Sequence, residues 1–411
     1  MDGPPNDDAP SLAARGVELH RSGQLDAAVA SYRAALALAP ELRDVWYNLA
    51  SAYRHLGRVT AAIEAYEQAV ALAPDQADGW NNLGLALRDD GAPDQAVAAF
   101  RHALALEPSS AAALVNLGNA LRDCGRRAEA ADAYHRAIAS DPSCVAAHFN
   151  LHAALYRAAD PEPARQALMG ALELDPAHEG ARFHRAAIDL LHHGDDHGAL
   201  AALPARCDFL VDSCRYVARH RTAATHLFAD TFETLRHGFA HARKEGLVIE
   251  LGVRRGTSIR LVAELCSPGQ VVHGFDAFEG LPTAWGEQPE GLYSTTGALP
   301  EVPDPVRLHP GWFADTLPAF VRAHDEPLRF VNVDCDVYES TRCALEVLGP
   351  RLSAGTVLVF DEYLCNPSWR QDEHRAWIEA VARHGLRYEY LAFSLFTRQA
   401  AVRISAVGAP G

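Results

Sequence analysis

Lysine, paired cysteines and long apolar runs are what this sequence lacks. Lys244 is the only lysine, and none of the eight cysteines belongs to a C-x-x-C pair. The cysteine pattern argues against a zinc knuckle or a redox dithiol and predicts reduced thiols. No apolar run approaches the roughly 20 residues that a membrane-spanning helix needs, and residues 1–10 lack the basic and apolar segments of a secretory signal. We therefore expect a cytoplasmic protein without a membrane partner.

Positive charge is also in short supply. The chain has 37 basic against 53 acidic residues, which gives a formal net charge of −16. Such a chain is repelled by phosphate backbones, so we expect no nucleic-acid partner. Its 411 residues are enough for two domains, which is the simplest expectation for this length.

The first half of the chain repeats itself every 34 residues. Within each unit an alanine precedes an aromatic residue or leucine by four positions and a second alanine by seven, as in Ala28, Tyr32 and Ala35. Small residues let two antiparallel helices approach closely, and a proline ends the second helix. The pattern resembles the tetratricopeptide repeat. Successive units end at Pro40, Pro74, Pro108, Pro142 and Pro176.

The repeats set the expected domain boundaries. We predict a disordered N-terminus over residues 1–8 and a solenoid over 9–205. The solenoid comprises five repeats and a degenerate hairpin near 179–205 that caps the last apolar face. A helical connector is expected over 206–243, and a second domain over 244–411.

Asparagine recurs at one position of the first helix in successive repeats. Asparagine is a poor helix former, so its recurrence suggests a function, although a solvated or helix-bonded side chain is the plainer alternative. An asparagine ladder can bind the main chain of an extended peptide. The ladder resembles that in the repeat domain of O-linked N-acetylglucosamine transferase, and this resemblance implies a peptide or protein partner. The residues are Asn48, Asn82, Asn116 and Asn150.

The second half alternates short apolar runs with helical stretches, which is typical of a doubly wound, Rossmann-like α/β sheet. The last two runs have no helix-length segment between them and predict an antiparallel hairpin, as in the methyltransferase version of this sheet. The expected strands cover 247–251, 271–275, 328–333, 356–360, 387–393 and 400–404.

The first of these strands runs into a glycine turn that opens a helix. The turn reads E-x-G-x-x-x-G rather than the G-x-G-x-x-G of nicotinamide-binding proteins, which disfavours an oxidoreductase and favours S-adenosylmethionine. Asp276 ends the next strand, where a carboxylate can accept both ribose hydroxyls of the cofactor. The predicted cofactor-binding residues are Glu250, Gly252, Gly256, Thr257, Ser258, Asp276 and Phe278.

Acidic residues follow two further strands. Asp334, Asp361 and Glu362 lie at the ends of strands expected to be neighbours, about 4.8 Å apart. Carboxylates grouped in this way repel one another unless a cation lies among them, and oxygen ligands suit Mg²⁺. The alternative is that these acids cap helices or face solvent.

Four ordered motifs over residues 210–404 resemble the macrocin O-methyltransferase family. They are the segments 274–282, 311–318, 334–341 and 360–363. The resemblance implies a Mg²⁺- and S-adenosylmethionine-dependent enzyme that methylates sugar hydroxyls of natural products. It also implies that Asp334, Asp361 and Glu362 hold the metal and that Asp336 is the general base. The family more often has a second aspartate where this chain has Glu362.

The leading hypothesis is therefore an O-methyltransferase with a small-molecule hydroxyl acceptor and a partner-recruiting repeat domain. The alternative is a non-catalytic binding scaffold with a degenerate methyltransferase module. His309 and His374 are rival candidates for the general base. The glycine- and proline-rich segment 278–300 predicts a mobile lid, in which Trp285 and Tyr293 contact the substrate.

Overall fold

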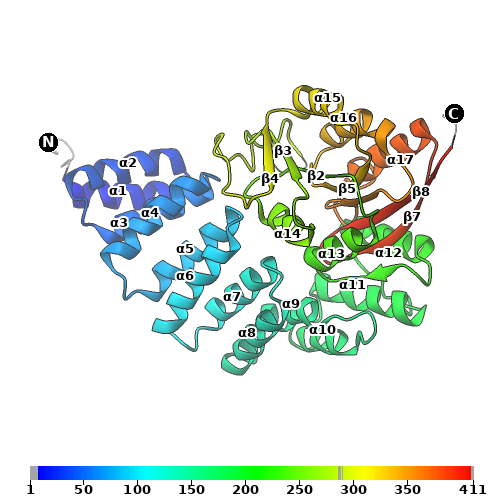
Figure 1. Cartoon of the computed structure of the whole chain (residues 1–411). Helices are drawn as coiled ribbons and strands as arrows, with labels where there is room; N and C mark the ends of the chain where they lie inside the picture. The colour runs from blue at the N-terminus through cyan, green and yellow to red at the C-terminus, as the bar shows by residue number, and fades with distance from the viewer. Residues whose placement is uncertain (1–7, 286–287, 289, 409–411) are drawn as a thin grey trace. The chain divides into compact units, whose positions relative to one another are not determined.

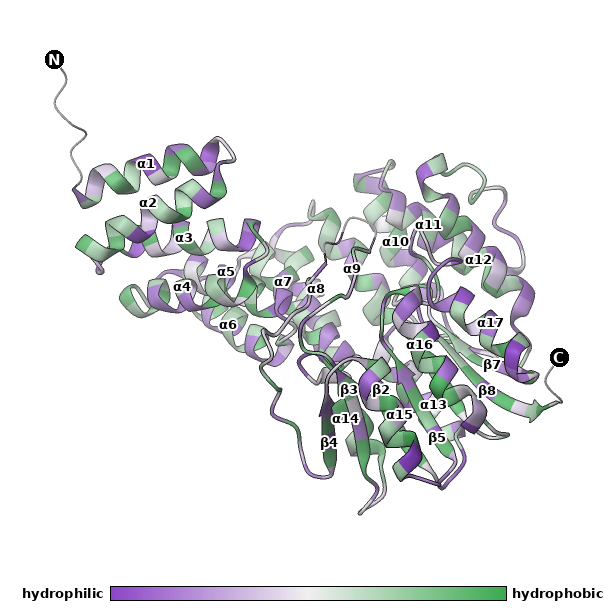
Figure 2. Ribbon diagram, turned by 90° about the horizontal axis from the view of Figure 1, so that it is seen from above, coloured by the Kyte–Doolittle hydropathy of each residue, from purple (hydrophilic) through white to green (hydrophobic). Residues whose placement is uncertain are grey.

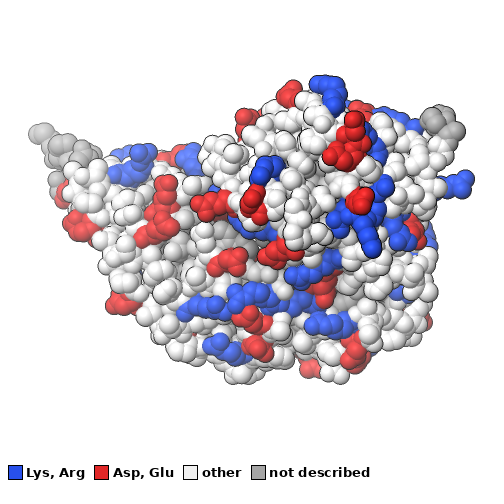
Figure 3. All heavy atoms as spheres, in the orientation of Figure 1, with Lys and Arg blue, Asp and Glu red and all other residues white. Residues whose placement is uncertain are grey.

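The computed structural model describes residues 8–285, 288 and 290–408. The chain forms two compact units, Met1–Ala147 and His148–Gly411. No helix within the described residues is both long enough and apolar enough to span a bilayer. On the face drawn in Figure 3, basic and acidic side chains are interspersed.

The first unit consists of antiparallel helix pairs (Figure 1). In each pair the alanine at the helix crossing is fully buried, as at Ala28, and so is the aromatic residue four positions later, as at Tyr134. Glycines in the left-handed conformation, such as Gly57 at φ 70°, form the turn within each pair. The helices are α1 (Ala9–Arg21), α2 (Leu25–Leu38), α3 (Arg43–His55), α4 (Val59–Leu72), α5 (Ala77–Asp89), α6 (Pro93–Leu106), α7 (Ala111–Asp123) and α8 (Arg127–Ser140).

The repeat pattern continues past the boundary between the units. Helix α9 (Val145–Leu155) crosses it, and α10 (Glu162–Leu174) and α11 (Glu179–Ile188) follow. The predicted capping hairpin over 179–205 is only half formed. After α11 and a π-helical turn (Asp189–His193), the chain runs through turns instead of a second helix. Gly194 and Gly198 adopt positive φ there, which ends the helical conformation.

The predicted connector over 206–243 is helical, but it also contributes to the sheet domain. It contains a 3₁₀ turn (Ala205–Cys207), α12 (Asp208–His220), the short strand β1 (His226–Leu227) and α13 (Thr231–His241). A Cβ atom on Gly238 of α13 would lie 2.9 Å from a methyl group of Val359, so the helix backbone rests directly on the sheet.

Within the described ranges the sheet has eight strands in the order β1-β7-β8-β6-β5-β2-β3-β4, of which β8 is the one that runs antiparallel to its neighbours. The strands after β1 are β2 (Leu247–Leu251), β3 (Val272–Asp276), β4 (Val306–Pro310), β5 (Leu328–Val333), β6 (Val357–Phe360), β7 (Leu386–Phe393) and β8 (Ala400–Val407). All six predicted strands are present within a few residues. β1 and β4 were not predicted.

Helices cover both faces of the sheet (Figure 1). Figure 2 shows the central strands as largely apolar, whereas the helices alternate apolar and polar residues. This is the pattern expected of a sheet buried on both sides. The helices after α13 are α14 (Thr257–Leu265), α15 (Phe313–Ala323), α16 (Tyr338–Leu348), a 3₁₀ turn (Gly349–Arg351) and α17 (Glu373–His384). The predicted fold class, a helical repeat array followed by a doubly wound α/β domain, is confirmed.

Candidate functional site

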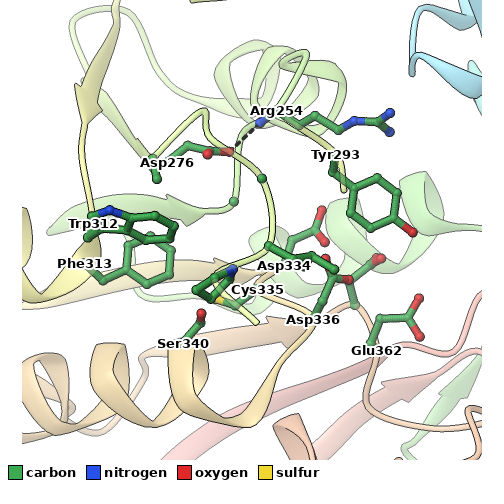
Figure 4. A pocket seen from close by; sticks show the side chains of 16 residues that line it. Arg254, Asp276, Tyr293, Trp312, Phe313, Asp334, Cys335, Asp336, Ser340 and Glu362 are labelled. Carbon is green, nitrogen blue, oxygen red and sulfur yellow. Dashed lines mark hydrogen bonds between the residues drawn. The ribbon is translucent and has the colours of Figure 1, made fainter. Parts of the chain in front are cut away.

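A pocket of about 340 Å³ lies at the carboxyl ends of the central strands. This is the rim at which the strand order reverses beside β2, the usual ligand position in doubly wound sheets. Figure 4 shows Asp334, Asp336 and Glu362 gathered on one side of the pocket and Trp312 and Phe313 on the other.

The glycine turn after β2 forms part of the pocket wall. Gly252 has φ +90°, and a Cβ atom there would lie 1.8 Å from the backbone oxygen of Asp334. Its N–H donates to the backbone oxygen of Phe275 at 2.9 Å, so the turn is fixed between β3 and β5. Gly256, at φ +78°, precedes α14 but does not line the pocket in the part of the chain that is described.

Glu250 lies beneath this turn rather than in the pocket. Its carboxylate is fully buried and accepts hydrogen bonds from Ser258 Oγ at 2.9 Å and from Asn332 Nδ2 at 3.2 Å. Burial raises the pKa of Glu250 to about 8. Glu250 and Ser258 therefore brace the turn from below, and Thr257 opens the helix beside them.

Asp276, predicted to accept the ribose hydroxyls of the cofactor, lines the pocket, but backbone N–H groups already occupy most of its carboxylate. Oδ2 accepts the backbone N–H groups of Val253 and Arg254 at 2.8 and 2.7 Å, and Oδ1 accepts that of Phe278 at 2.6 Å. The Arg254 bond is drawn in Figure 4. A carboxylate has about four lone-pair sites, so about one remains for a ligand hydroxyl. Phe278 itself is buried and has φ +59°.

Four carboxyl groups line the opposite side of the pocket. Burial raises the pKa of Asp334 well above its usual range, and Asp361 adds to the rise. Burial also raises the pKa of Asp336, to about 7. The backbone of Asp336 is left-handed, at φ +60°. Glu362 completes the group.

The chemistry of these groups suits a hard divalent cation, because all the donors are carboxylate oxygens. Within the described residues, no three His, Cys, Asp or Glu side chains are already arranged around a metal position. Both carboxylate oxygens of Glu362 instead accept hydrogen bonds from Arg398 Nη1, at 3.0 Å each. The donor set therefore fits a cation at Asp334 and Asp361, whereas Glu362 would have to share its carboxylate with Arg398.

Three residues behind the acids were missed by sequence reasoning. Arg398 contacts Glu362, and Gln399 Nε2 donates to Asp361. Glu373, the first residue of α17, is fully buried and accepts the backbone N–H groups of Cys335 and Glu362 at 3.4 and 3.0 Å. Arg398 and Gln399 lie 36 and 38 residues along the chain from the acids that they contact, and Glu373 lies 11 residues after Glu362, so no short motif marks these residues.

Trp312 and Phe313 were also not assigned a role, although they form the wall facing the acids. They directly follow β4, which was not predicted. The motif over 311–318 contains both residues and is the sequence signal that could have identified them, and in the structure Trp312 remains 39% exposed.

The rival bases lie outside the pocket. Among the described residues the pocket wall includes neither His309 nor His374. His309 stacks on Phe275 with ring centroids 4.4 Å apart. His374 lies among aromatic rings, 4.9 Å from Trp369 and 5.1 Å from Tyr363.

The predicted lid includes residues 286, 287 and 289, which lie outside the described residues. The described part is folded upon itself, and Leu281 N–H donates to the oxygen of Leu292 at 2.9 Å. Tyr293 lines the pocket, and Arg254 lies 4.9 Å from its ring centroid. Its contact with the substrate stays a prediction. Trp285 points elsewhere and donates from Nε1 to Asp372 at 3.0 Å.

The asparagines of the repeats bind their own fold. Asn82 Nδ2 donates to the Tyr47 hydroxyl at 2.7 Å and to the backbone oxygen of Asp78 at 2.8 Å. Asn116 Nδ2 donates to Asn81 Oδ1 at 3.0 Å. The bonds to Tyr47 and Asn81 join successive repeats, and the bond to Asp78 lies within one helix, so part of the hydrogen-bonding capacity of Asn82 and Asn116 is already used by the fold. Asn48, like the other predicted peptide-binding residues including Asn150, is partly buried.

Known families match both halves of the chain. A tetratricopeptide repeat profile matches residues 14–77, a second one matches residues 87–155, and a profile described as a methyltransferase domain matches residues 249–363. A solved structure of the MamA protein is 24% identical and covers 41% of this chain and 92% of that one, with a TM-score of 0.39.

Three curated relatives are bacterial O-methyltransferases. An 8-demethyl-8-(2,3-dimethoxy-alpha-L-rhamnosyl)-tetracenomycin-C 4'-O-methyltransferase from Streptomyces olivaceus is 36% identical over 29% of this chain and 53% of that protein. Demethyldecarbamoylnovobiocin O-methyltransferase from Streptomyces niveus is 30% identical over 32% and 58%. Mycinamicin III 3''-O-methyltransferase from Micromonospora griseorubida is 35% identical over 29% and 42%.

The chain thus spans about half the length of the curated relatives that it matches. The repeat profiles and the methyltransferase profile match separate regions of the chain, in the order that the fold requires. A methyltransferase domain implies S-adenosylmethionine as the methyl donor. This protein carries tetratricopeptide repeats in its N-terminal region and a methyltransferase domain in its C-terminal part.

Proposed function

We propose that this chain is an S-adenosylmethionine-dependent O-methyltransferase of the macrocin type, acting on a hydroxyl of a sugar or natural-product acceptor. The observation that carries the proposal is that one pocket is lined both by Gly252 of the glycine turn and by Asp334 and Asp336. The names of the three relatives support it, since each is an O-methyltransferase and one includes a rhamnosyl group, which is a sugar.

When bound, S-adenosylmethionine supplies an already activated methyl group, so the protein has to align an acceptor oxygen and help it lose its proton. Gly252 lines the pocket, and its missing side chain lets the turn pack directly on the backbone of Asp334. The lone-pair site left on Asp276 accepts one ribose hydroxyl. Glu250 and Ser258 support the turn from beneath. We also assign Gly256, Thr257 and Phe278 to the cofactor site.

We further propose that Mg²⁺ takes part, held by Asp334 and Asp361 with Glu362 as a third ligand. The bound metal would lower the pKa of an acceptor hydroxyl and fix its orientation. The support is the buried group of carboxylates, which repel one another as they stand. Asp336, on the same wall of the pocket, takes the proton from the acceptor oxygen.

The test is the variant Asp336→Asn, which keeps the shape of the side chain and removes its basicity. Calorimetry should find S-adenosylmethionine bound within about twofold of wild type, whereas transfer of a labelled methyl group to acceptors in an extract of the source organism should fall by about 10²- to 10⁴-fold. Unimpaired transfer by this variant would remove Asp336 from the mechanism. Full activity after chelation of divalent metals would remove Mg²⁺.

For the repeats, we propose a peptide or protein partner on the first unit. Asn82 and Asn116 retain carbonyl oxygens that can accept main-chain N–H groups, although their donors are used within the stack. The competing scaffold hypothesis requires no cofactor. Absence of S-adenosylmethionine binding in calorimetry would favour the scaffold.

A further inference from the structure

A six-residue turn between β7 and β8, residues 394–399, reaches the acidic side of the pocket. This 394–399 turn makes three contacts with the segment that follows β6. Arg398 Nη1 donates to both carboxylate oxygens of Glu362, at 3.0 Å each, and Gln399 Nε2 donates to Asp361. The backbone N–H of Leu364 donates to the oxygen of Arg398 at 2.9 Å. Asp361 and Glu362, the acid pair, are therefore both held by the same turn.

Internal hydrogen bonds hold the turn in one conformation. Ser394 N–H donates to the oxygen of Gln399 at 2.9 Å, and Thr397 Oγ1 donates to Ser394 Oγ at 2.8 Å. Ser394 and Gln399 are fully buried. Arg398 has φ +67°, a left-handed conformation that a residue with a side chain keeps only where its surroundings impose it.

The other side of the turn packs against helices of the same unit. The Phe396 ring lies 4.8 Å from the ring of His152 and 5.1 Å from that of Tyr156, both near the end of the repeat region. It also lies 4.7 Å from the ring of His184 in α11. Tyr156 and His152 are buried. Phe396 thus fixes the turn on one side while Arg398 and Gln399 reach the acids on the other.

The Arg398 side chain is 47% exposed, whereas that of Glu362 is only 13% exposed. Solvent screens the arginine, but the largely buried carboxylate still needs a partner, so the contact both stabilises the fold and orients Glu362. The planar guanidinium fixes the orientation of the carboxylate that it contacts. Glu362 is one of the residues assigned to the metal in the proposed function, and its orientation decides whether its oxygens face the pocket.

We propose that Arg398 and Gln399 are positioning residues for the pair Asp361 and Glu362, and that Phe396 anchors them to α9 and α11. The inference rests on the proposed function for the role of the acid pair, but not for the anchoring. Groups that orient metal ligands from behind typically change metal affinity or activity by about 10- to 100-fold when removed.

The first test measures Mn²⁺ binding by electron paramagnetic resonance, without turnover, in full-length protein. Arg398→Met should weaken Mn²⁺ binding by about 10- to 100-fold and leave S-adenosylmethionine binding within twofold. Arg398→Lys should fall between Arg398→Met and wild type, since it keeps the charge and loses the planar fork. Arg403→Met is the matched control, because Arg403 pairs with Glu389 on the same hairpin, away from the acids. Binding of Mn²⁺ by Arg398→Met as tight as wild type, or tighter, would overturn the positioning role.

The second test follows hydrogen exchange at the backbone amide of Leu364, which bonds to Arg398. Phe396→Ala should accelerate this exchange by about tenfold or more, while Val248 in the central strand stays protected and reports an intact fold. If Phe396→Ala does not fold, Phe396→Leu keeps most of the apolar volume and should show the same effect more weakly. Unchanged exchange at Leu364 would overturn the anchoring. Wild-type protein that binds no Mn²⁺ would overturn the metal part of the proposed function, and the exchange at Leu364 would still decide the anchoring.

Discussion

Gly252 offers the sharpest test of the pocket, because the chain contains a matched control for its substitution. Gly252→Ala places a Cβ atom 1.8 Å from the backbone oxygen of Asp334, about 1.6 Å short of an ordinary contact. Gly269→Ala imposes a similar backbone strain, at φ +86°, but nothing lies within 4 Å of the new atom. The difference between the two variants therefore isolates the overlap.

The expected magnitudes follow from that geometry. A left-handed alanine costs roughly 1–2 kcal/mol, which is what Gly269→Ala should lose in free energy of unfolding. In Gly252→Ala the backbone fixes the position of the new Cβ, and the atom that it meets is a backbone oxygen, so no side-chain rotation relieves the overlap. We expect a loss above about 4 kcal/mol, the range of severe substitutions. A displacement of about 1 Å at a reacting centre costs about 10²-fold in rate, and Asp334 and Asp336 would both move.

Urea unfolding followed by circular dichroism gives the free energies, and calorimetry gives the affinity for S-adenosylmethionine. Gly269→Ala should bind the cofactor as wild type does, whereas Gly252→Ala should bind it at least tenfold more weakly. Gly256→Ala provides an intermediate case, since its new atom would make only ordinary contacts of 3.4 Å or more. Equal stability and equal cofactor affinity of Gly252→Ala and Gly269→Ala would refute the close approach at Asp334.

Three further predictions concern other residues. Burial lowers the pKa of His374 to about 4, and the ring nitrogens have no hydrogen-bond partner within the described structure. The wild-type free energy of unfolding should therefore fall by up to about 3 kcal/mol as the pH drops from 6.5 to 4. Urea unfolding of His374→Phe should not show this loss. Parallel pH profiles of the two proteins would contradict the prediction. Burial raises the pKa of Glu250 to about 8, so wild-type protein loses free energy of unfolding as the pH rises from about 4.5 to 8. Over that interval the free energy of unfolding of Glu250→Gln should rise by up to about 5 kcal/mol relative to wild type. A difference that stays constant with pH would contradict this prediction. Trp285→Phe removes the bond to Asp372, worth about 0.5–1.5 kcal/mol, and should make proteolysis of segment 282–300 about 2- to 10-fold faster; an unchanged rate would show that this bond does not hold the segment.

The elements of the fold that sequence predicts well are those with a strong period or a continuous apolar run. The 34-residue repeat places the helices of the first unit, and β2 and β5 have the predicted boundaries. β4 was missed because only Val306 of its five residues is buried, as at the edge of a sheet. β1 has two residues, too few for any periodicity. The predicted second helix of the capping hairpin does not form, because glycines interrupt it.

The pocket was predictable to the extent that its residues follow strands. Asp276, Asp334 and Asp361 each end or follow a strand, and all three line the pocket. Glu250 shows the limit of this reasoning, since a residue inside a buried strand faces the interior beneath the turn rather than the ligand. Asp276 shows a second limit, because sequence does not reveal how many of its lone pairs the backbone already uses.

Arg398 and Gln399 were missed because only the strand register brings them to the acids. Phe360 pairs with Ala400 in the antiparallel register of β6 and β8, so continuing the same register places residue 361 opposite 399 and residue 362 opposite 398. A correct prediction of that register would have found both contacts. The hairpin was predicted, but its place beside β6 was not.

The same register explains why the turn between β7 and β8 meets the acids at all. Parallel strands reach this rim only with their carboxyl ends, and each then leaves for a helix or loop. β8 is antiparallel to its neighbours and therefore begins at the rim, so the turn before it lies beside the segment after β6. An arginine and a glutamine in that turn supply the donors that the acid pair needs, while Phe396 of the same turn packs on α9 and α11. Only one residue separates Phe396 from Arg398. We therefore expect a substitution at that packing contact to disturb the hydrogen bonds of Glu362 before it changes the rest of the pocket.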